Sequence, residues 1–214
     1  MMDPAIDRVL TRWSPERQER ARAVLAAYPE RRSTVMPLLY LASREHGYCS
    51  REAMVEVGKI TGLTSIQVES VASFYSMYRR QNVGKYVISV CTSISCFLRG
   101  ADDVLAAIED ETNTPDGETS DDALFSVEHV ECSGACGGAP AVAVNWELIE
   151  GVLPDKGRAL CQWLKDTQPE TVLADEMQAL FGGQQSFDWG IAEPQGATSH
   201  VPAFERYDSA GDAS

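Results

Sequence analysis

Two close pairs of cysteines are the residues of this sequence whose types and spacing could do chemistry. Cys91 and Cys96 are spaced C-x4-C, and Cys132 and Cys136 are spaced C-x3-C. Four converging thiolates are the usual requirement of an iron–sulfur cluster, and structural zinc also accepts close cysteine pairs. A cluster would carry electrons, whereas zinc would only stabilise the fold, and the spacing alone leaves both alternatives open.

Disulfide bonds are a weaker alternative. The first residues, MMDPAID, are acidic and lack the apolar core of a secretory signal, so we expect a reducing compartment. Paired cysteines in such a compartment more often bind metal or do redox chemistry than form disulfides. Four unrelated core cysteines are not expected to fall into two tight pairs. Cys49 and Cys161 have no close partner, and we expect both to be small buried hydrophobes.

The rest of the sequence lacks the motifs of other chemistries. His46, His129 and His200 show no metal-ligand spacing, no Cys-x-His pairing supports a Rieske centre, and His129 is expected to be structural. The sequence contains no P-loop, no G-x-G-x-x-G between a strand and a helix, and no nucleophile–base motif. We therefore expect no catalytic residue and no nucleotide or flavin site in this chain.

Charge and hydropathy exclude two further kinds of partner. The net charge is −14, and the negative charge is concentrated beyond residue 81, which argues against a nucleic-acid partner. The apolar runs are much shorter than the roughly 20 residues of a spanning helix, so direct membrane insertion is not expected. Acidic surroundings would also disfavour adding an electron to a cluster, and this lowers its reduction potential.

Residues 1–81 are predicted to form a small bundle of four short helices. Capping residues mark the predicted helix starts, and a glycine or a residue before proline marks the stops. The predicted starts are at Ser14, Ser33, Ser50 and Thr64, and the predicted stops are at Tyr28, Gly47 and Gly62.

Residues 82–166 are predicted to form a small sheet with helices packed on it, in the order β-α-β-β-α. Alternating apolar residues indicate the strands, and helical spacing indicates the helices. The predicted strands are 85–90, 123–131 and 140–145, with 146–150 pairing beside the last, and the predicted helices are 97–110 and 153–166. Each cysteine pair follows a strand, so loops at one end of the sheet could bring the two pairs together.

Residues 167–214 are predicted to form an acidic extension that is partly extended or disordered. One helix is indicated over 170–181, and the stretch beyond it is rich in Gly, Pro and Ser without a regular apolar period. Its scattered aromatic residues could anchor the extension on a partner protein. They are Phe187, Trp189, Phe204 and Tyr207.

An ordered series of segments resembles one known family. The segments are VESVASFYSMY (68–78), VGKYVISVCTSISC (83–96), GETSDDALFSVEHVEC (117–132) and CSGACGGAP (132–140). From about Arg31 to Lys165 the chain resembles the small thioredoxin-like [2Fe–2S] subunit of respiratory complex I, the NADH:quinone oxidoreductase. This family includes the bacterial E-chain and mitochondrial flavoprotein 2. The series is far more specific than four cysteines, and it favours [2Fe–2S] over zinc.

The resemblance implies an α+β fold, in which an N-terminal helical bundle (1–81) precedes a thioredoxin-like [2Fe–2S] ferredoxin domain (82–166). It implies an electron-transfer subunit of the NADH-oxidising module that holds one [2Fe–2S] cluster. The implied ligands are Cys91, Cys96, Cys132 and Cys136. FMN and NADH are expected in a partner flavoprotein with which single electrons are exchanged, and the large multi-cluster iron–sulfur subunit is a second candidate partner.

The implied location is the cytoplasmic side of the membrane, or the matrix side in a mitochondrion, with attachment through the complex. Two alternatives remain. One is the equivalent diaphorase subunit of an NAD-reducing hydrogenase or an NAD-dependent formate dehydrogenase. The other is a structural assembly subunit whose metal site transfers no electrons.

A few positions depart from the family pattern, and at Ala139-Pro140 we expect an unusual peptide bond. Ala123 replaces a turn glycine, and its Cβ would strain a left-handed backbone. The residues after Cys136 are unusually small. Ala139-Pro140 opens a strand where thioredoxin-like folds often carry a cis-proline, so we predict a cis bond there.

Overall fold

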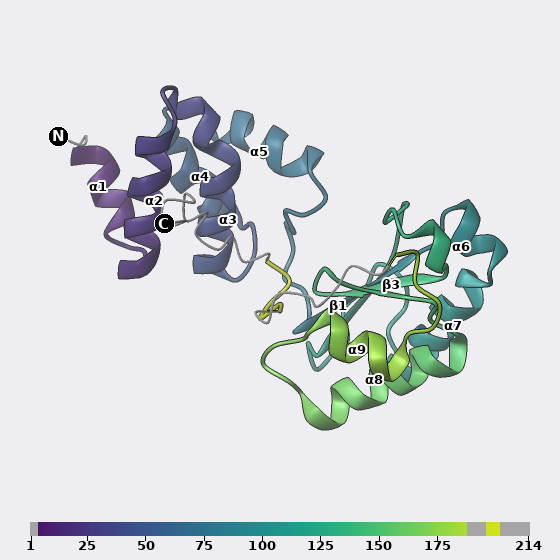
Figure 1. Cartoon of the computed structure of the whole chain (residues 1–214). Coiled ribbons are helices and arrows are strands. Elements are labelled where there is room, and N and C mark those ends of the chain that lie inside the picture. Colours follow the sequence, from purple (N-terminus) through teal and green to yellow (C-terminus); the bar gives the residue numbers. More distant parts are fainter. Residues whose placement is uncertain (1–3, 188–195, 202–214) are drawn as a thin grey trace, which may run out of the picture. The chain divides into compact units, whose positions relative to one another are not determined.

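The computed structural model describes residues 4–187 and 196–201. The chain divides into two compact units, Met1–Asn82 and Val83–Ser214 (Figure 1). The described part of the first unit is helical, and the second contains a four-stranded sheet with helices. The predicted α+β class is therefore confirmed.

Five α-helices and one 3-10 turn make up the described part of the N-terminal unit. They are α1 (Pro4–Leu10), α2 (Pro15–Ala27), η1 (Arg31–Thr34), α3 (Val35–His46), α4 (Arg51–Thr61) and α5 (Ser65–Phe74). The four predicted helices are present as α2 to α5. The additional helix α1 spans only two turns, and its Ile6, Val9 and Leu10 are too few to reveal a helical period in the sequence.

Two of the four predicted capping residues cap their helices through the side chain, whereas Ser14 stands at the N-cap position of α2 without a side-chain capping hydrogen bond. The Ser50 hydroxyl accepts a hydrogen bond from the Ala53 N–H at 3.1 Å, and Thr64 forms a reciprocal capping box with Gln67. The predicted start at Ser33 is wrong. Ser33 lies inside η1, and α3 begins only after Thr34, because the chain first forms a 3-10 turn that ends in the helix.

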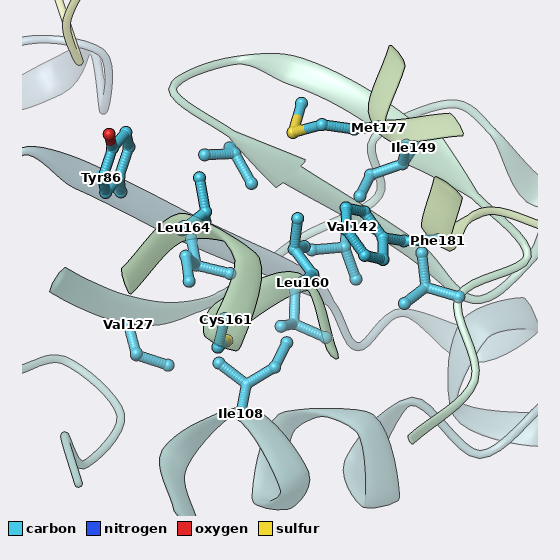
Figure 2. Close-up of a cluster of buried hydrophobic side chains, with 14 of the residues drawn as sticks. Tyr86, Ile108, Val127, Val142, Ile149, Leu160, Cys161, Leu164, Met177 and Phe181 are labelled. Carbon is cyan, nitrogen blue, oxygen red and sulfur yellow. The ribbon is translucent and has the colours of Figure 1, made fainter. Parts of the chain in front are cut away.

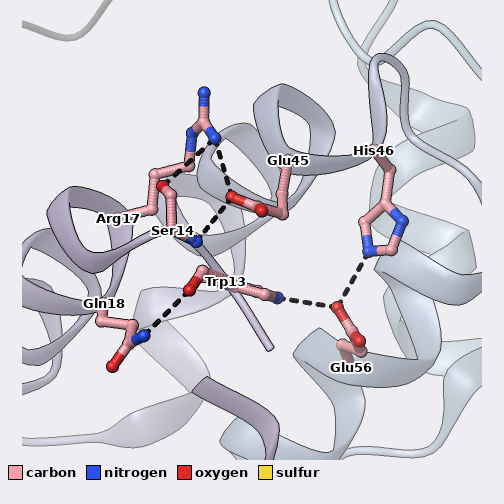
Figure 3. Close-up of polar contacts among 7 residues, drawn as sticks. All are labelled: Trp13, Ser14, Arg17, Gln18, Glu45, His46 and Glu56. Carbon is pink, nitrogen blue, oxygen red and sulfur yellow. Dashed lines mark hydrogen bonds and ion pairs between the residues drawn. The ribbon is translucent and has the colours of Figure 1, made fainter. Parts of the chain in front are cut away.

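Two carboxylates, Glu45 and Glu56, accept several of the polar contacts inside the N-terminal unit (Figure 3). The Glu56 carboxylate accepts from the Trp13 indole N–H at 2.7 Å and lies 2.9 Å from the His46 ring. Glu56, on α4, is therefore connected to Trp13 in the turn between α1 and α2, and to His46 at the end of α3. Glu45 accepts from the Ser14 backbone N–H and from the Arg17 guanidinium.

The C-terminal unit is built on a four-stranded mixed sheet in the order β2-β1-β3-β4. β1 and β2 are parallel, whereas β3 is antiparallel to both β1 and β4. The four strands are β1 (Tyr86–Cys91), β2 (Phe125–Val130), β3 (Ala141–Val144) and β4 (Glu147–Glu150). All four strands are predicted by the sequence, and the observed ends lie within two residues of most predicted ends.

The described helices of this unit differ from prediction at two places. They are α6 (Ile94–Leu98), α7 (Ala101–Thr112), η2 (Cys136–Gly138), α8 (Pro154–Thr167) and α9 (Ala174–Phe181). The single helix predicted over 97–110 is wrong, because Gly100 adopts a left-handed conformation with φ of +88° and separates α6 from α7. The helix predicted over 170–181 starts late, because Val172 forms a β-bridge with Ala197.

The core of the C-terminal unit lies on one face of the sheet (Figure 2). Tyr86, Ile88 and Val90 alternate along β1 and point into this core, where α7, α8 and α9 cover them. Helix α9 belongs to the residues predicted as an extension, yet its Met177 and Phe181 are core residues. The core therefore continues beyond residue 166.

The sequence singles out one peptide bond, one backbone angle and two unpaired cysteines. The Ala139–Pro140 bond is cis, and Ala123 has a positive φ of 55°, as predicted. Cys49 and Cys161 are both fully buried, also as predicted.

Three of the four aromatic residues proposed as anchors, Trp189, Phe204 and Tyr207, lie outside the described residues, and Phe187 is exposed. Within residues 4–187 and 196–201, no helix combines the length and the apolar character needed to span a bilayer.

Candidate metal centre

The four paired cysteines lie at one end of the sheet. Because β1 and β2 are parallel, their carboxyl ends meet at the same edge, with Cys91 opposite Val130. Cys91 is the last residue of β1, and Cys132 follows β2 by two residues. Cys96 lies in the short helix α6, and Cys136 begins η2. The topology therefore brings together the two loops that the sequence predicts to converge.

The thiols are arranged as two pairs. The Cys132 and Cys136 sulfur atoms are 3.5 Å apart, and Cys91 and Cys96 share a hydrogen bond. All six cysteines of the chain are free thiols. Among the described residues, no three His, Cys, Asp or Glu side chains surround a single metal position. Two pairs match the donor set of a [2Fe–2S] cluster, in which four thiolates serve two iron atoms.

Serines link the two cysteine loops to each other. The backbone and side chain of Ser133 in the second loop hydrogen-bond to the Cys91 thiol of the first. The Ser95 side chain in the first loop hydrogen-bonds to the Cys136 thiol of the second. The sequence alone assigns no role to these serines, although Ser133 departs from the leucine that is usual in the family after the third ligand. The signal was present, because serines stand inside both CTSISC and CSGAC.

Small side chains surround the buried half of the site. Cys91 and Cys96 are buried among four alanines, whereas Cys132 and Cys136 are exposed. The alanines are Ala101, Ala135, Ala139 and Ala141. Such residues let backbone N–H groups approach sulfur, and the Ala141 N–H does hydrogen-bond to Cys96. Hydrogen bonds of this kind, together with solvent exposure, set the potential of an iron–sulfur centre.

The four thiols differ in acidity. Burial alone would raise the pKa of Cys91, but hydrogen bonds from Ser133, Ser93 and Cys96 lower it below its ordinary value. Burial raises the pKa of Cys96 to about 11, and the hydrogen bond with Cys132 raises the pKa of Cys136. Metal binding requires all four thiolates, so it must release protons from the less acidic thiols.

His129 lies apart from the thiol pairs and contacts a carboxylate. Its ring Nδ1 is 2.6 Å from Asp116, and its backbone N–H donates to the same carboxylate. This contact agrees with the structural role predicted for His129. The contact with Asp116 raises the pKa of His129 above its ordinary value.

The fold and the site together define a thioredoxin-like domain that carries an iron–sulfur centre. Residues 21–165 match the thioredoxin-like [2Fe–2S] ferredoxin family, and the chain belongs to that family. Its cofactor is accordingly one [2Fe–2S] cluster, and the family predicted from the sequence is confirmed.

Two curated relatives match this chain over most of its length. The chain is 35% identical to the E subunit of the NADH-quinone oxidoreductase of Mycobacterium bovis, over 70% of this chain and 60% of that protein. It is 31% identical to the mitochondrial NADH dehydrogenase [ubiquinone] flavoprotein 2 of Dictyostelium discoideum, over 87% of this chain and 73% of that protein. The chain thus spans about 60% of the length of the mycobacterial relative.

A solved structure confirms the fold. The chain resembles part of an NAD+-reducing [NiFe]-hydrogenase in the H2-reduced state, with a TM-score of 0.59 and 18% identity. The similarity covers 68% of this chain and 25% of the hydrogenase chain.

Proposed function

We propose that this chain is the electron-transfer subunit of the NADH-oxidising module of respiratory complex I. The observation that carries the proposal is the convergence of the two cysteine loops at one end of the sheet, in a member of the [2Fe–2S] ferredoxin family. When bound, a [2Fe–2S] cluster supplies one-electron chemistry, which joins the two-electron oxidation of NADH at a flavin to single-electron carriers.

Four residues hold the cluster in this proposal, namely Cys91, Cys96, Cys132 and Cys136. The strands β1 and β2 fix the roots of both loops, because the apolar core immobilises them. Ser133 and Ser95 hold the loops against each other, and the N–H of Ala141 is positioned at Cys96. The proposal assigns no catalytic acid, base or nucleophile to this chain.

The partners in this proposal follow from the family and from the names of the relatives. FMN and NADH belong to a partner flavoprotein, which passes single electrons to this chain, and the large multi-cluster iron–sulfur subunit is a further neighbour. The chain resides on the cytoplasmic side of the membrane, or on the matrix side in a mitochondrion, and is attached through the complex. The names of the curated relatives support this host over a hydrogenase or a formate dehydrogenase.

The ligand assignment is tested by replacing single cysteines. Purified protein should contain iron and acid-labile sulfide without zinc, and should give a [2Fe–2S] EPR signal after reduction with dithionite. Cys96→Ser and Cys132→Ser should each abolish or alter this signal. Cys49→Ala is the matched control, because Cys49 is a buried cysteine of the other unit. An unchanged signal in both serine variants would refute the assignment.

The carrier role is tested with the flavoprotein. The protein should co-purify with an FMN-containing partner, and NADH should then reduce the cluster within the catalytic turnover time. If the bound cluster never exchanges electrons with the flavin, the chain is a structural assembly subunit instead. Mass spectrometry of the co-purified proteins identifies the host complex.

A further inference from the structure

The segment after α9 passes around the edge of the sheet and reaches the second cysteine loop. β4 is an edge strand, and α9 packs beside it on the core face. The Gly183 N–H donates to the Glu150 carbonyl at 2.8 Å, and the Gly138 N–H donates to the Ser186 hydroxyl at 2.8 Å. The family match ends at residue 165, so this segment lies outside the matched region.

A side-chain amide occupies the free edge of β4. The Gln178 Oε1 atom accepts from the Glu150 N–H at 2.8 Å, and the Gln178 Nε2 atom donates to the Glu150 carbonyl at 3.2 Å. The amide thus satisfies the backbone groups that a further strand would otherwise pair. As a result, both backbone polar groups of Glu150 have partners on the side of β4 that faces away from β3.

The Glu150 side chain lies on the same face of the sheet as the buried thiols. Side chains alternate along β4, and Ile149 belongs to the core on the opposite face. Leu148, which shares the face of Glu150, packs against the small cluster around Cys91 and Cys96. Glu150 pairs directly with Ala141, whose N–H hydrogen-bonds to Cys96. The residue is only 3% exposed, so its carboxylate is buried next to the site.

Glu150 contacts the second cysteine loop through Ser186. Its Oε2 atom accepts from the Ser186 N–H at 2.6 Å, and the Ser186 hydroxyl accepts from Gly138. A Cβ atom added at Gly138 would lie 2.0 Å from Glu150 Oε2 and 2.6 Å from the Gln184 carbonyl. The unusually small residues after Cys136 therefore have a physical reason, because the returning segment occupies the space of a side chain.

We propose that Glu150 and Ser186 are positioning residues for the iron–sulfur centre. Ser186 holds the Cys136 loop through the Gly138 N–H, and Glu150 orients Ser186 while placing a buried carboxylate beside the centre. Residues that orient metal ligands typically change metal affinity about 10–100-fold when they are removed. A buried charge acts through a lower dielectric than a surface charge, so it influences the potential more strongly. This inference rests on the proposed ligand set.

Two variants test the hydrogen bond of Ser186 and the charge of Glu150 separately. Ser186→Ala removes the shorter hydrogen bond of the Gly138 N–H and leaves it only the Ala135 carbonyl at 3.2 Å, so loss of the cluster to a chelator should become about tenfold faster. Glu150→Gln keeps the size and an acceptor oxygen but removes the charge, so the midpoint potential should become more positive. Ser199→Ala is the matched control, because the half-buried Ser199 hydroxyl accepts from the Val201 N–H in the same C-terminal region.

The measurements are the EPR spectrum of the dithionite-reduced full chain, its midpoint potential in a chemical redox titration, and the rate of bleaching with chelator. A shifted potential in Glu150→Gln, with faster bleaching in Ser186→Ala and wild-type values in Ser199→Ala, supports the proposal. Wild-type spectrum, potential and bleaching rate in both variants overturn it, even if thermal stability falls. If Ser186→Ala does not accumulate, the potential of Glu150→Gln decides alone.

Failure of this inference is distinguishable from failure of the proposed function. The redox titration uses chemical reductants and needs no flavoprotein. A wild-type chain that lacks a [2Fe–2S] signal, or that does not exchange electrons with the flavin, contradicts the proposed function before any variant is compared. A normal wild-type cluster with unresponsive variants contradicts only the roles of Glu150 and Ser186.

Discussion

In the N-terminal unit a buried carboxylate joins two helices and a turn, whereas in the C-terminal unit apolar side chains from four strands and three helices form the core (Figures 2 and 3). Glu56 is only 7% exposed and receives hydrogen bonds from Trp13 and His46. The core of the C-terminal unit includes Tyr86, Phe125 and Leu160, all nearly inaccessible. The N-terminal unit also has fully buried apolar side chains, such as Leu38, Leu39 and Ile60. Glu56 therefore adds single directional contacts to the many weak apolar contacts that stabilise both units.

This difference indicates how each unit serves the proposed function. A densely packed apolar core resists small displacements, so the strands that carry the cysteine loops keep their positions. The small residues lie on the other face, where the site needs space. The N-terminal unit contains no paired cysteines, and its buried carboxylate connects its segments by hydrogen bonds.

The largest effect is expected from a cavity in the C-terminal core. Leu160→Ala should lower the free energy of unfolding of this unit by about 2–5 kcal/mol, because a fully buried side chain is lost. Urea titration followed by far-UV circular dichroism and by cluster absorbance measures it. Leu153→Ala is the control, since Leu153 is 53% exposed and should cost less than about 0.5 kcal/mol. Equal costs at the two positions would contradict the assigned core.

The next effect is expected at the carboxylate of the N-terminal unit. Glu56→Ala leaves the Trp13 indole N–H without its acceptor and should cost about 1–3 kcal/mol. Tryptophan fluorescence during urea unfolding measures this, and the EPR signal should stay unchanged because the cysteine pairs lie in the other unit. Asp7→Asn is the control, because the exposed pair with Arg22 contributes at most about 1 kcal/mol. An altered EPR signal in Glu56→Ala would show that the units are not independent.

A smaller effect is expected when the pH is lowered. Burial opposes the ionisation of Glu45, but hydrogen bonds from Ser14 and Arg17 lower its pKa below the ordinary value. Its contribution to stability is therefore present above the ordinary carboxyl pKa and is lost as the pH falls through the lowered pKa. Unfolding of the N-terminal unit should depend on acid pH in the wild type and less so in Glu45→Gln. Identical pH profiles for both proteins would argue against this role.

The smallest effect is expected at His129. The hydrogen bond with Asp116 raises the pKa of His129, so Asp116→Asn should return that pKa toward its ordinary value. The stabilisation from this pair is present below the ordinary histidine pKa and is lost as the pH rises through the raised pKa. An NMR titration of the ring protons measures the shift. A raised pKa that persists in Asp116→Asn would assign its cause to Glu131 or Glu128 instead.

Much of the fold was predictable because it is encoded locally. Capping residues and glycines indicated α2, α4 and α5, and alternating apolar residues indicated all four strands. The errors occurred where local signals compete. The break between α6 and α7 depends on the left-handed conformation of Gly100. The sequence pattern does not indicate this break, because an isolated glycine is tolerated inside a helix.

The site was partly predictable for the same reason. The four cysteines stand out by type and spacing, and the ordered segments around them indicate the family. Ser133 and Ser95 are different, because their role depends on which loop faces which thiol across the sheet end. No local pattern specifies that pairing.

The sequence by itself therefore determined the element types, the candidate ligands and the family, since these depend on residue identity and near-neighbour spacing. Only the tertiary structure decided that residues 174–187 return to the sheet, that Gln178 closes its edge, and that Glu150 and Ser186 reach the second cysteine loop. Such contacts join residues that are 28 to 48 positions apart. They arise because the apolar face of α9 is buried in the core, and this packing fixes where the chain that follows it must run.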